Sequence, residues 1–281
     1  MSVVDLVRDA LVEAGSTFRP DKKEAYRRAI KRETDEKAKW VLQTVLENAE
    51  AAEKNRSPLC DDTGIPHLVL EVGPDCAVTG RILDEIKQGV AEGLRQLPGR
   101  PMGILGNDSQ RIDQSGGLDP DSAGVAPAPI LIRRCEENTI RLHILMFGGG
   151  PAIRAKTYRV FHRHNTQVVL DEIVKWAIES VAQLGCSPCT LAVGVGRSHF
   201  EAASMMLQAQ VDGKYDVQSE MEAEITRRVN EADIGPLGLG GSTSVIATFM
   251  KVGPQRASGV RIVCVRPTCC FEPRNASIEL V

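Results

Sequence analysis

The stretch TQVVLDEIVKWAIESVAQLGCSPCTLAVGVGRS, residues 166–198, decides the fold class. Residues 166–185 predict a long helix, and Gly185 is a typical end for it because glycine readily takes the left-handed conformation that ends helices. Residues 186–198 predict a strand that runs into a turn. A helix that leads directly into a strand is typical of proteins that mix both elements, so this stretch favours the α/β class.

The chain on either side of this stretch also alternates helices with strands. Residues 2–54 predict helices, because apolar residues such as Trp40 and Leu42 recur at helical spacing, and Pro58 ends the last one. The other predicted elements are a strand at 65–73, a helix at 81–97, a long loop at 98–128, two strands joined as a hairpin within 128–150, helices at 200–210 and 219–232, a glycine-rich loop and strand within 232–253, and a strand at 259–267. The simplest organisation is one integrated α/β domain over residues 1–281, with a helical part over about residues 1–56.

Composition excludes several classes of protein. The 281 residues carry a net charge of −3 and only 4% aromatic residues, which argues against nucleic-acid binding. No run of about 18 apolar residues predicts a membrane span. The N-terminus lacks the basic start and the cleavage site of a signal peptide, so we expect a cytoplasmic protein in a reducing compartment.

Eight cysteines need an explanation in such a compartment, where clustered thiols bind metal or act in catalysis more often than they form disulfides. Cys60, Cys186 and the Cys269–Cys270 pair each adjoin a predicted strand, where the backbone could present a thiolate to a shared centre. For any single cysteine the alternative is a buried, inert thiol. Cys186 and Cys189 have CxxC spacing, a weak redox signal because it stands between a helix and a strand rather than the reverse.

Two further motifs could carry chemistry. In SPLCDDTG, residues 57–64, the carboxylates Asp61 and Asp62 follow Cys60 directly, which suggests either a metal centre or a chance surface turn. The glycine-rich stretches GGG, residues 148–150, and GPLGLGGST, residues 235–243, let backbone amides approach a carboxylate or phosphate, with tight turns as the alternative.

The order of these motifs resembles the alpha region of the iron–sulfur hydro-lyases, the family of class I fumarate hydratases and L(+)-tartrate dehydratases. The likeness extends from about residue 30 to residue 275. It rests on LENAEAAEKNRSPLCDDTG at 46–64, MFGGGP at 146–151, LGCSPCTLAVGVGRSHFEAA at 184–203, and IGPLGLGGSTSVIATFMKVG at 234–253 followed by CCFEPR at 269–274.

The resemblance implies a [4Fe-4S] cluster held by three cysteines, whose fourth iron activates the substrate as a Lewis acid. By position the ligands are Cys60, Cys186 and either Cys269 or Cys270, of which Cys270 is preferred because Arg274 then follows at the family spacing. The substrate implied is a small hydroxy-dicarboxylate such as malate, fumarate or tartrate.

The resemblance also assigns roles around the cluster. Asp62 is the candidate acid–base or orienting group, and Arg95 is the candidate cationic clamp for a substrate carboxylate. Asp61, Thr63, Gly149 and Gly150 complete the expected substrate-binding set, together with Arg95.

The sequence departs from the family at several of these places. Asp61 replaces a glutamine, so it should repel an anionic substrate unless a proton or a cation offsets its charge. Pro151 follows the glycines, Ser242 replaces a lysine, and Gln255 or Arg256 takes the place of a histidine. Loss of an acid–base group costs about 10²–10⁴ in rate when nothing replaces it.

The family's single-chain members carry a second, beta-type domain that is absent from these 281 residues. We therefore expect a separate beta subunit and a homo- or hetero-oligomer, without nucleic acid or membrane partners. The alternatives are a diverged iron–sulfur paralogue with another lyase reaction and a non-catalytic iron–sulfur partner subunit.

Overall fold

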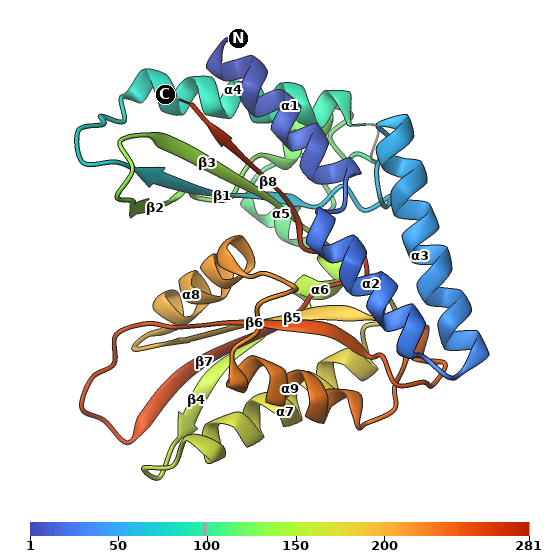
Figure 1. Cartoon of the computed structure of the whole chain (residues 1–281). Helices are drawn as coiled ribbons and strands as arrows, with labels where there is room; N and C mark the ends of the chain where they lie inside the picture. Colours follow the sequence, from blue (N-terminus) through green and yellow to red (C-terminus); the bar gives the residue numbers. More distant parts are fainter. Residues whose placement is uncertain (98–99, 281) are drawn as a thin grey trace. The chain divides into compact units, whose positions relative to one another are not determined.

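The protein is described by a computed structural model over residues 1–97 and 100–280, and it contains helices and two β-sheets (Figure 1). This confirms the mixed α/β class predicted from residues 166–198. The chain folds as two compact units: one contains residues 1–18, 49–149 and the segment from 274 onward, and the other contains residues 19–48 and 150–273. A single catalytic domain over the whole chain stays a prediction. No helix in the described ranges is long and apolar enough to cross a membrane.

The first unit contains a four-stranded sheet with the order β2-β1-β3-β8. Its elements are α1 (Val3–Ser16), β1 (Ile65–Val72), α4 (Gly80–Gln96), α5 (Asp108–Asp113), η1 (Ser122–Val125), β2 (Leu131–Arg134), β3 (Ile140–Phe147) and β8 (Arg274–Glu279). Strand β1 lies between β2 and β3, parallel to the first and antiparallel to the second. The predicted hairpin of β2 and β3 is therefore wrong, because β3 pairs along its whole length with β1 instead.

One face of this sheet is apolar and packs against α1 and α4. Leu68 and Leu70 of β1 are fully buried there with residues of β3 and of both helices. The helices approach each other closely at Gly89 of α4, where an added Cβ would lie only 2.6 Å from Val7. Glycine thus permits the contact between α1 and α4.

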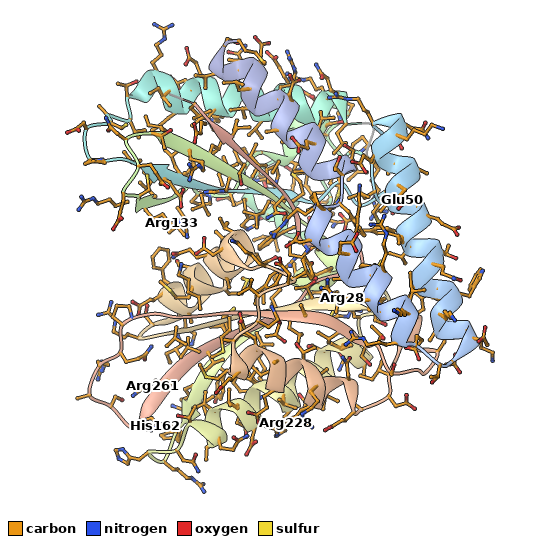
Figure 2. The ribbon with its side chains drawn as sticks, viewed as in Figure 1. Arg28, Glu50, Arg133, His162, Arg228 and Arg261 are labelled. Carbon is orange, nitrogen blue, oxygen red and sulfur yellow. The ribbon has the colours of Figure 1, made fainter. Side chains whose placement is uncertain are left out.

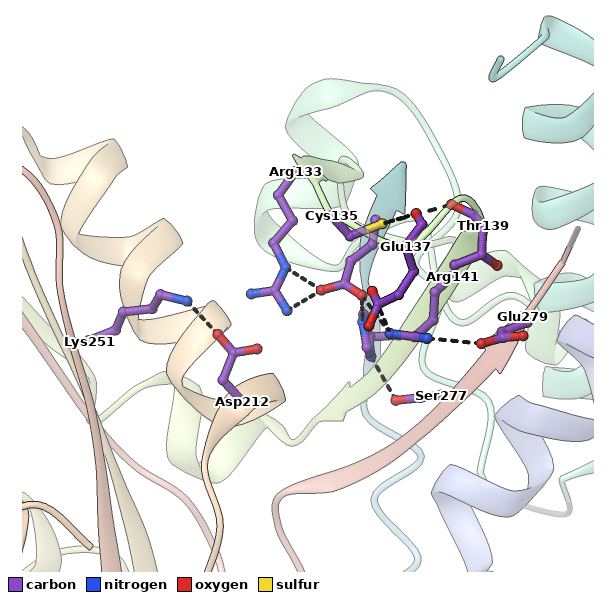
Figure 3. Close-up of polar contacts among 11 residues, drawn as sticks. Arg133, Cys135, Glu137, Thr139, Arg141, Asp212, Lys251, Ser277 and Glu279 are labelled. Carbon is purple, nitrogen blue, oxygen red and sulfur yellow. Dashed lines mark hydrogen bonds and ion pairs between the residues drawn. The ribbon is translucent and has the colours of Figure 1, made fainter. Parts of the chain in front are cut away.

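The opposite face of the same sheet carries a charged network around Glu71. The Glu71 carboxylate pairs with Arg133 at 2.6 Å and with Arg141 at 3.3 Å, and it lies 3.2 Å from the His143 ring nitrogen Nε2. Arg141 also pairs with Glu279 of β8 at 2.9 Å (Figure 3). The network connects all four strands, because each contributes at least one of these residues.

The second unit contains a sheet with the order β4-β7-β5-β6. Its elements are α2 (Pro20–Arg32), β4 (Lys156–Phe161), α7 (Thr166–Ala182), β5 (Cys189–Gly196), α8 (His199–Asp212), α9 (Glu220–Asn230), η2 (Pro236–Gly238), β6 (Val245–Val252) and β7 (Val260–Pro267). Helix α3 (Glu36–Asn55) and the single turn α6 (Gly149–Ala152) contain the points where the chain passes between the units.

Helices cover both faces of this second sheet, with α8 on one face and α7 and α9 on the other (Figure 1). An added Cβ at Gly194 of β5 would lie 2.0 Å from the carbonyl oxygen of Ala202, so α8 packs directly on the backbone of β5. On the other face, Arg228 of α9, labelled in Figure 2, pairs with Asp171 of α7 at 2.8 Å. Strand β5 is buried throughout, as expected for a central strand covered on both faces.

Most predicted elements are present where the sequence placed them. Helix α7 ends before Gly185, which has φ +76°, and β5 follows. Residues 98–99 of the predicted long loop lie outside the described residues, and the rest of the loop contains only α5 and η1. Strands β4 and β8 were not predicted, because their alternating polar and charged residues give no continuous apolar signal.

Candidate functional site

The loop that carries Cys60 begins after α3 ends at Asn55, and Pro58 lies within it. Leu59 anchors the loop: its side chain is buried, and its N–H donates to the carbonyl of Gly15 at 2.9 Å. Cys60 is half-buried, with its Sγ 3.4 Å from the Asp61 carboxylate. The loop therefore presents a thiol on a backbone that is fixed on one side by α1.

Asp62 is the most strongly positioned carboxylate of this loop. One carboxylate oxygen accepts from the N–H of Gly64 at 3.1 Å, and the other accepts from the N–H of Gly149 at 2.9 Å. The buried Arg274 donates to the Asp62 carbonyl at 2.6 Å. Gly64 has φ +79° and lies so close to the Arg274 guanidinium that an added Cβ would be 2.4 Å from Nη2. Glycine is therefore required at this turn.

The GGG stretch contacts a carboxylate of the protein itself, that of Asp62. Gly149 donates to that carboxylate, and an added Cβ on Gly149 would meet no atom within 4 Å. An added Cβ on Gly150 would likewise meet no atom within 4 Å. Substrate binding by Gly149 and Gly150 stays a prediction.

The extra carboxylate of Asp61 lies beside a cation. Arg100 Nη1 is 3.5 Å from Asp61 Oδ2, and the two side chains are 59% and 78% exposed. Thr63 is buried, and its hydroxyl donates to the Arg100 carbonyl at 2.9 Å, which ties the two segments together. A cation therefore accompanies Asp61, although a pair this exposed contributes only about 0–1 kcal/mol.

Arg95, the predicted clamp, already holds a carboxylate of the protein. On the last turn of α4 its guanidinium donates to both oxygens of Asp121, at 2.9 and 2.7 Å. Hydrogen bonding to Arg95 is the first cause that lowers the pKa of Asp121. A substrate carboxylate would have to compete with Asp121 for this fork.

The second unit gathers three thiols at one end of its sheet. The N–H of Cys270 donates to the carbonyl of Cys186 at 2.8 Å. Cys186 is exposed, Cys269 is half-buried and Cys270 is buried. The pKa of Cys270 is raised, first by its hydrogen bond with Cys269, then by burial and by the charges of Cys269 and Cys186. The structure thus brings Cys186 together with both candidates for the third ligand.

Cys189 is a different kind of cysteine. It is 1% exposed at the start of β5 and packs in the core of the second unit. Burial is the main cause that raises its pKa. An uncharged thiol in an apolar core is inert, so Cys189 has a structural role.

A family model described as "Fumarate hydratase (Fumerase)" matches residues 4–279. The chain belongs to this fumarate hydratase family. It is similar to the "Putative L(+)-tartrate dehydratase subunit alpha" of Methanocaldococcus jannaschii, with 24% identity over 98% of this chain and 96% of that protein. It is 22% identical to the "L(+)-tartrate dehydratase subunit alpha" of Escherichia coli K12, over 88% of this chain and 80% of that protein. It is 27% identical to the "Putative fumarate hydratase class I" of Geobacillus stearothermophilus, over 86% of this chain but only 48% of that longer protein.

The structure shows where the chain departs from the pattern of the fumarate hydratase family, first at the position of a family histidine. Gln255 lies on the loop after β6, where its amide donates to the carbonyls of Gly253 at 2.9 Å and Val195 at 3.4 Å. Val195 is near the far end of β5, whereas Cys186 precedes the start of that strand. At about 3.3 Å per residue the two ends of β5 lie more than about 20 Å apart. Within the second unit, Gln255 is therefore remote from the thiols.

Ser242, at the position of a family lysine, belongs to the glycine-rich loop that adjoins Cys186. The Ser187 hydroxyl donates to the Gly235 carbonyl at 2.7 Å, which joins this loop to the cysteine segment. Ser242 donates through both its hydroxyl and its N–H to the buried carboxylate of Glu33, at 3.0 and 3.2 Å. Burial raises the pKa of Glu33, but these and neighbouring hydrogen bonds outweigh it and the pKa is lowered.

The donor set is suited to an iron–sulfur cluster in its chemistry. Thiolates are the ligands of such clusters, and the second unit places Cys186 and Cys270 on hydrogen-bonded backbone. Cys60 is in the first unit. Over residues 1–97 and 100–280, no group of three or more His, Cys, Asp or Glu side chains is arranged to hold a single metal ion.

Arg100 and Arg274 were missed as contributors to the Cys60 loop. Arg100 lies in a segment without regular structure, and Arg274 was noted only for its spacing from Cys270 in the sequence. Arg274 is 2% exposed at the start of β8, and no local sequence pattern indicates that an arginine will be buried, since arginine is mostly exposed.

Proposed function

We propose that this chain is the alpha subunit of a [4Fe-4S]-dependent hydro-lyase that adds or removes water on a small hydroxy-dicarboxylate, such as malate, fumarate or tartrate. The observation that carries the proposal is the Asp62 carboxylate, which two backbone amides hold next to Cys60 in the family's cysteine motif. Hydro-lyase names among the relatives support the reaction class.

The proposed cluster ligands are Cys60, Cys186 and Cys270. The backbone pairing of Cys186 with Cys270 supports two of them. The thiol of Cys269 is the alternative third ligand and is also close to Cys270. When bound, the cluster supplies a Lewis-acidic iron for a substrate carboxylate and hydroxyl.

Asp62 is the proposed proton carrier. Each of its carboxylate oxygens accepts one N–H, and each therefore keeps a lone pair that can take a proton from the substrate carbon. The two amides hold the carboxylate in one orientation, which is what general base catalysis requires. In the direction of hydration the same group returns the proton.

Substrate binding is proposed for Asp61, Thr63, Arg95, Gly149 and Gly150. An added Cβ on Gly149 would meet no atom within 4 Å, which leaves room for a small acid beside the amide that holds Asp62. Arg100 adds a second guanidinium to this set, since it is more than half exposed and faces Asp61. A substrate carboxylate matches either guanidinium fork.

A separate beta subunit is the proposed partner. Two relatives that align over most of their length are named as alpha subunits, and the longer class I relative is matched over about half of its length. A cytoplasmic location stays a prediction.

A second candidate keeps the cluster and changes the substrate. Asp61 favours this candidate, because its carboxylate places an extra negative charge next to Asp62. Arg100 offsets that charge only weakly, since the two side chains are 3.5 Å apart and well exposed. A substrate with a neutral or hydroxyl-bearing second end would suit that surface better than a second carboxylate.

The test is anaerobic purification of the chain with a beta-type subunit, followed by iron and sulfide counting and assays on fumarate, tartrate and mesaconate. The variants Cys60→Ser, Cys186→Ser and Cys270→Ser should each lose the cluster. Cys76→Ser, which changes a half-buried thiol outside both cysteine loops, is the matched control and should keep it. A wild-type preparation without iron would contradict the proposal. A preparation that holds the cluster but turns over none of the three acids would contradict the proposed dicarboxylate substrate.

A further inference from the structure

Helix α2 places a buried lysine against the loop of Cys269 and Cys270. Lys22 is 1% exposed, and its ammonium donates to the Glu272 carbonyl at 2.8 Å. Tyr26, one helical turn later, is fully buried, and its hydroxyl donates to the Cys270 carbonyl at 2.8 Å. Residues four apart share one face of a helix, so the two side chains hold the same loop from one side.

A second buried cation supports this loop from β7. Arg266 is 2% exposed and donates to the Glu272 carboxylate at 2.6 Å, and that carboxylate is fully buried. Burying an ionised side chain costs several kcal/mol before its partners offset it. The loop of Cys269 and Cys270 is thus held from two sides, by α2 through Lys22 and by β7 through Arg266.

The position of Lys22 places a buried positive charge against the loop of Cys270. Its ammonium is held at the carbonyl of Glu272, two residues after Cys270. A buried charge is screened far less than an exposed one, so it acts on groups nearby in the same loop.

We propose that Lys22 is a positioning residue of the cluster site: it fixes the Cys270 loop through the Glu272 carbonyl and offsets the negative charge of the ligating thiolates. This inference rests on the proposed function, because it needs a cluster at Cys270. It concerns the second unit alone, to which all these residues belong. Lys22 acts through the loop of Cys270.

The experiment compares Lys22→Met, which removes both the charge and the donor, with Lys22→Gln, which keeps an amide donor and removes the charge. Lys31→Met is the matched control, because Lys31 is an exposed residue of the same helix. Two quantities are measured anaerobically on the complete protein with its beta-type partner: the rate of iron loss to a chelator, and the cluster's reduction potential by electron paramagnetic resonance titration.

We expect Lys22→Met to lose iron faster, by about 10–100-fold, the usual effect of removing a group that supports a metal ligand. Both Lys22 variants should shift the reduction potential to more negative values, because a lost positive charge disfavours the added electron. Lys31→Met should match the wild type in both measurements.

The outcomes separate this inference from the proposed function. A wild type without a cluster overturns the proposed function and this inference with it. A wild type with a cluster, together with Lys22 variants of unchanged potential, overturns the role of Lys22 alone. If Lys22→Met does not fold, as judged by near-ultraviolet circular dichroism, Lys22→Gln decides. Failure of both to fold overturns the inference, since Lys22 would then be purely structural.

Discussion

The N–H of Gly149 lies 2.9 Å from a carboxylate oxygen of Asp62, although 87 residues separate them in sequence. Together with Gly64, it converts a flexible acid into an oriented one. An oriented carboxylate beside a predicted cluster ligand is the centre of the proposed chemistry.

Replacing Asp62 by Asn should abolish most turnover without loss of iron. The amide cannot take up a proton at working pH, and removal of a general base typically costs about 10²–10⁴ in rate. We would measure kcat and iron content on the same preparation. Loss of iron in parallel with activity would instead give Asp62 a role in holding the loop.

Replacing Gly64 by Ala should destabilise the first unit. The residue has φ +79°, and its new Cβ would meet the buried Arg274 guanidinium. We expect a loss of about 1–3 kcal/mol in the free energy of unfolding, measured with urea. Gly80→Ala is the control, because its Cβ would meet nothing within 4 Å and it begins helix α4. Equal effects of the two changes would contradict the strain argument.

Glu71 should make stability depend on pH in the acid range. Burial raises its pKa, but the contacts with Arg133 and His143 outweigh it, so the pKa lies below the ordinary value of 4.5. The folded state therefore gains stability from ionised Glu71 above about pH 4.5, and it loses this gain as the pH falls through the lowered pKa.

Glu71→Gln measures this contribution. At pH 7 the variant should be less stable by about 3 kcal/mol, the lower end for a buried pair that loses one partner. The difference from the wild type should shrink as the pH falls below 4.5. Glu136→Gln, at an exposed position in the turn before β3, is the control and should change little. A difference that stays constant with pH would contradict the assignment.

Asp61→Gln should improve the binding of a dianionic substrate. It removes a negative charge next to the proposed site while Arg100 remains, so KM should fall, within about fivefold because both side chains are well exposed. Stability should not change measurably. The gain should diminish at high ionic strength, where exposed charges are screened. An unchanged or higher KM for every dicarboxylate would favour the candidate with a different substrate.

Local signals predicted most of the helices and strands. Helix α7 and strand β5 were predictable because apolar periodicity and Gly185 act within a few residues. The hairpin of β2 and β3 was wrong because the preference of β3 for β1 is a pairing between distant segments. Strand β8 escaped notice because its buried Arg274 breaks the apolar pattern.

Some residues of the candidate site were likewise predictable from local motifs, whereas others depend on contacts between distant segments. Cys60 and Asp62 were predicted from a contiguous motif, and the contact of Asp62 with the GGG turn agrees with their shared family pattern. The partners Arg100 and Lys22 come from other segments, and their roles depend on contacts made only in the folded chain. Arg95 was predicted as a clamp, but its pairing with Asp121 depends on a loop without regular structure.

Both donors to the Asp62 carboxylate are main-chain amides. Among substitutions, only one to proline removes such a donor. The orientation of the Asp62 carboxylate therefore depends on the backbone conformation and not on which side chains the neighbouring residues carry. Asp61 and Arg100, by contrast, meet through side chains. Substitutions can therefore change the charge at Asp61 and Arg100, and with it the preferred substrate acid. The carboxylate of Asp62, the proposed proton carrier, would keep its position.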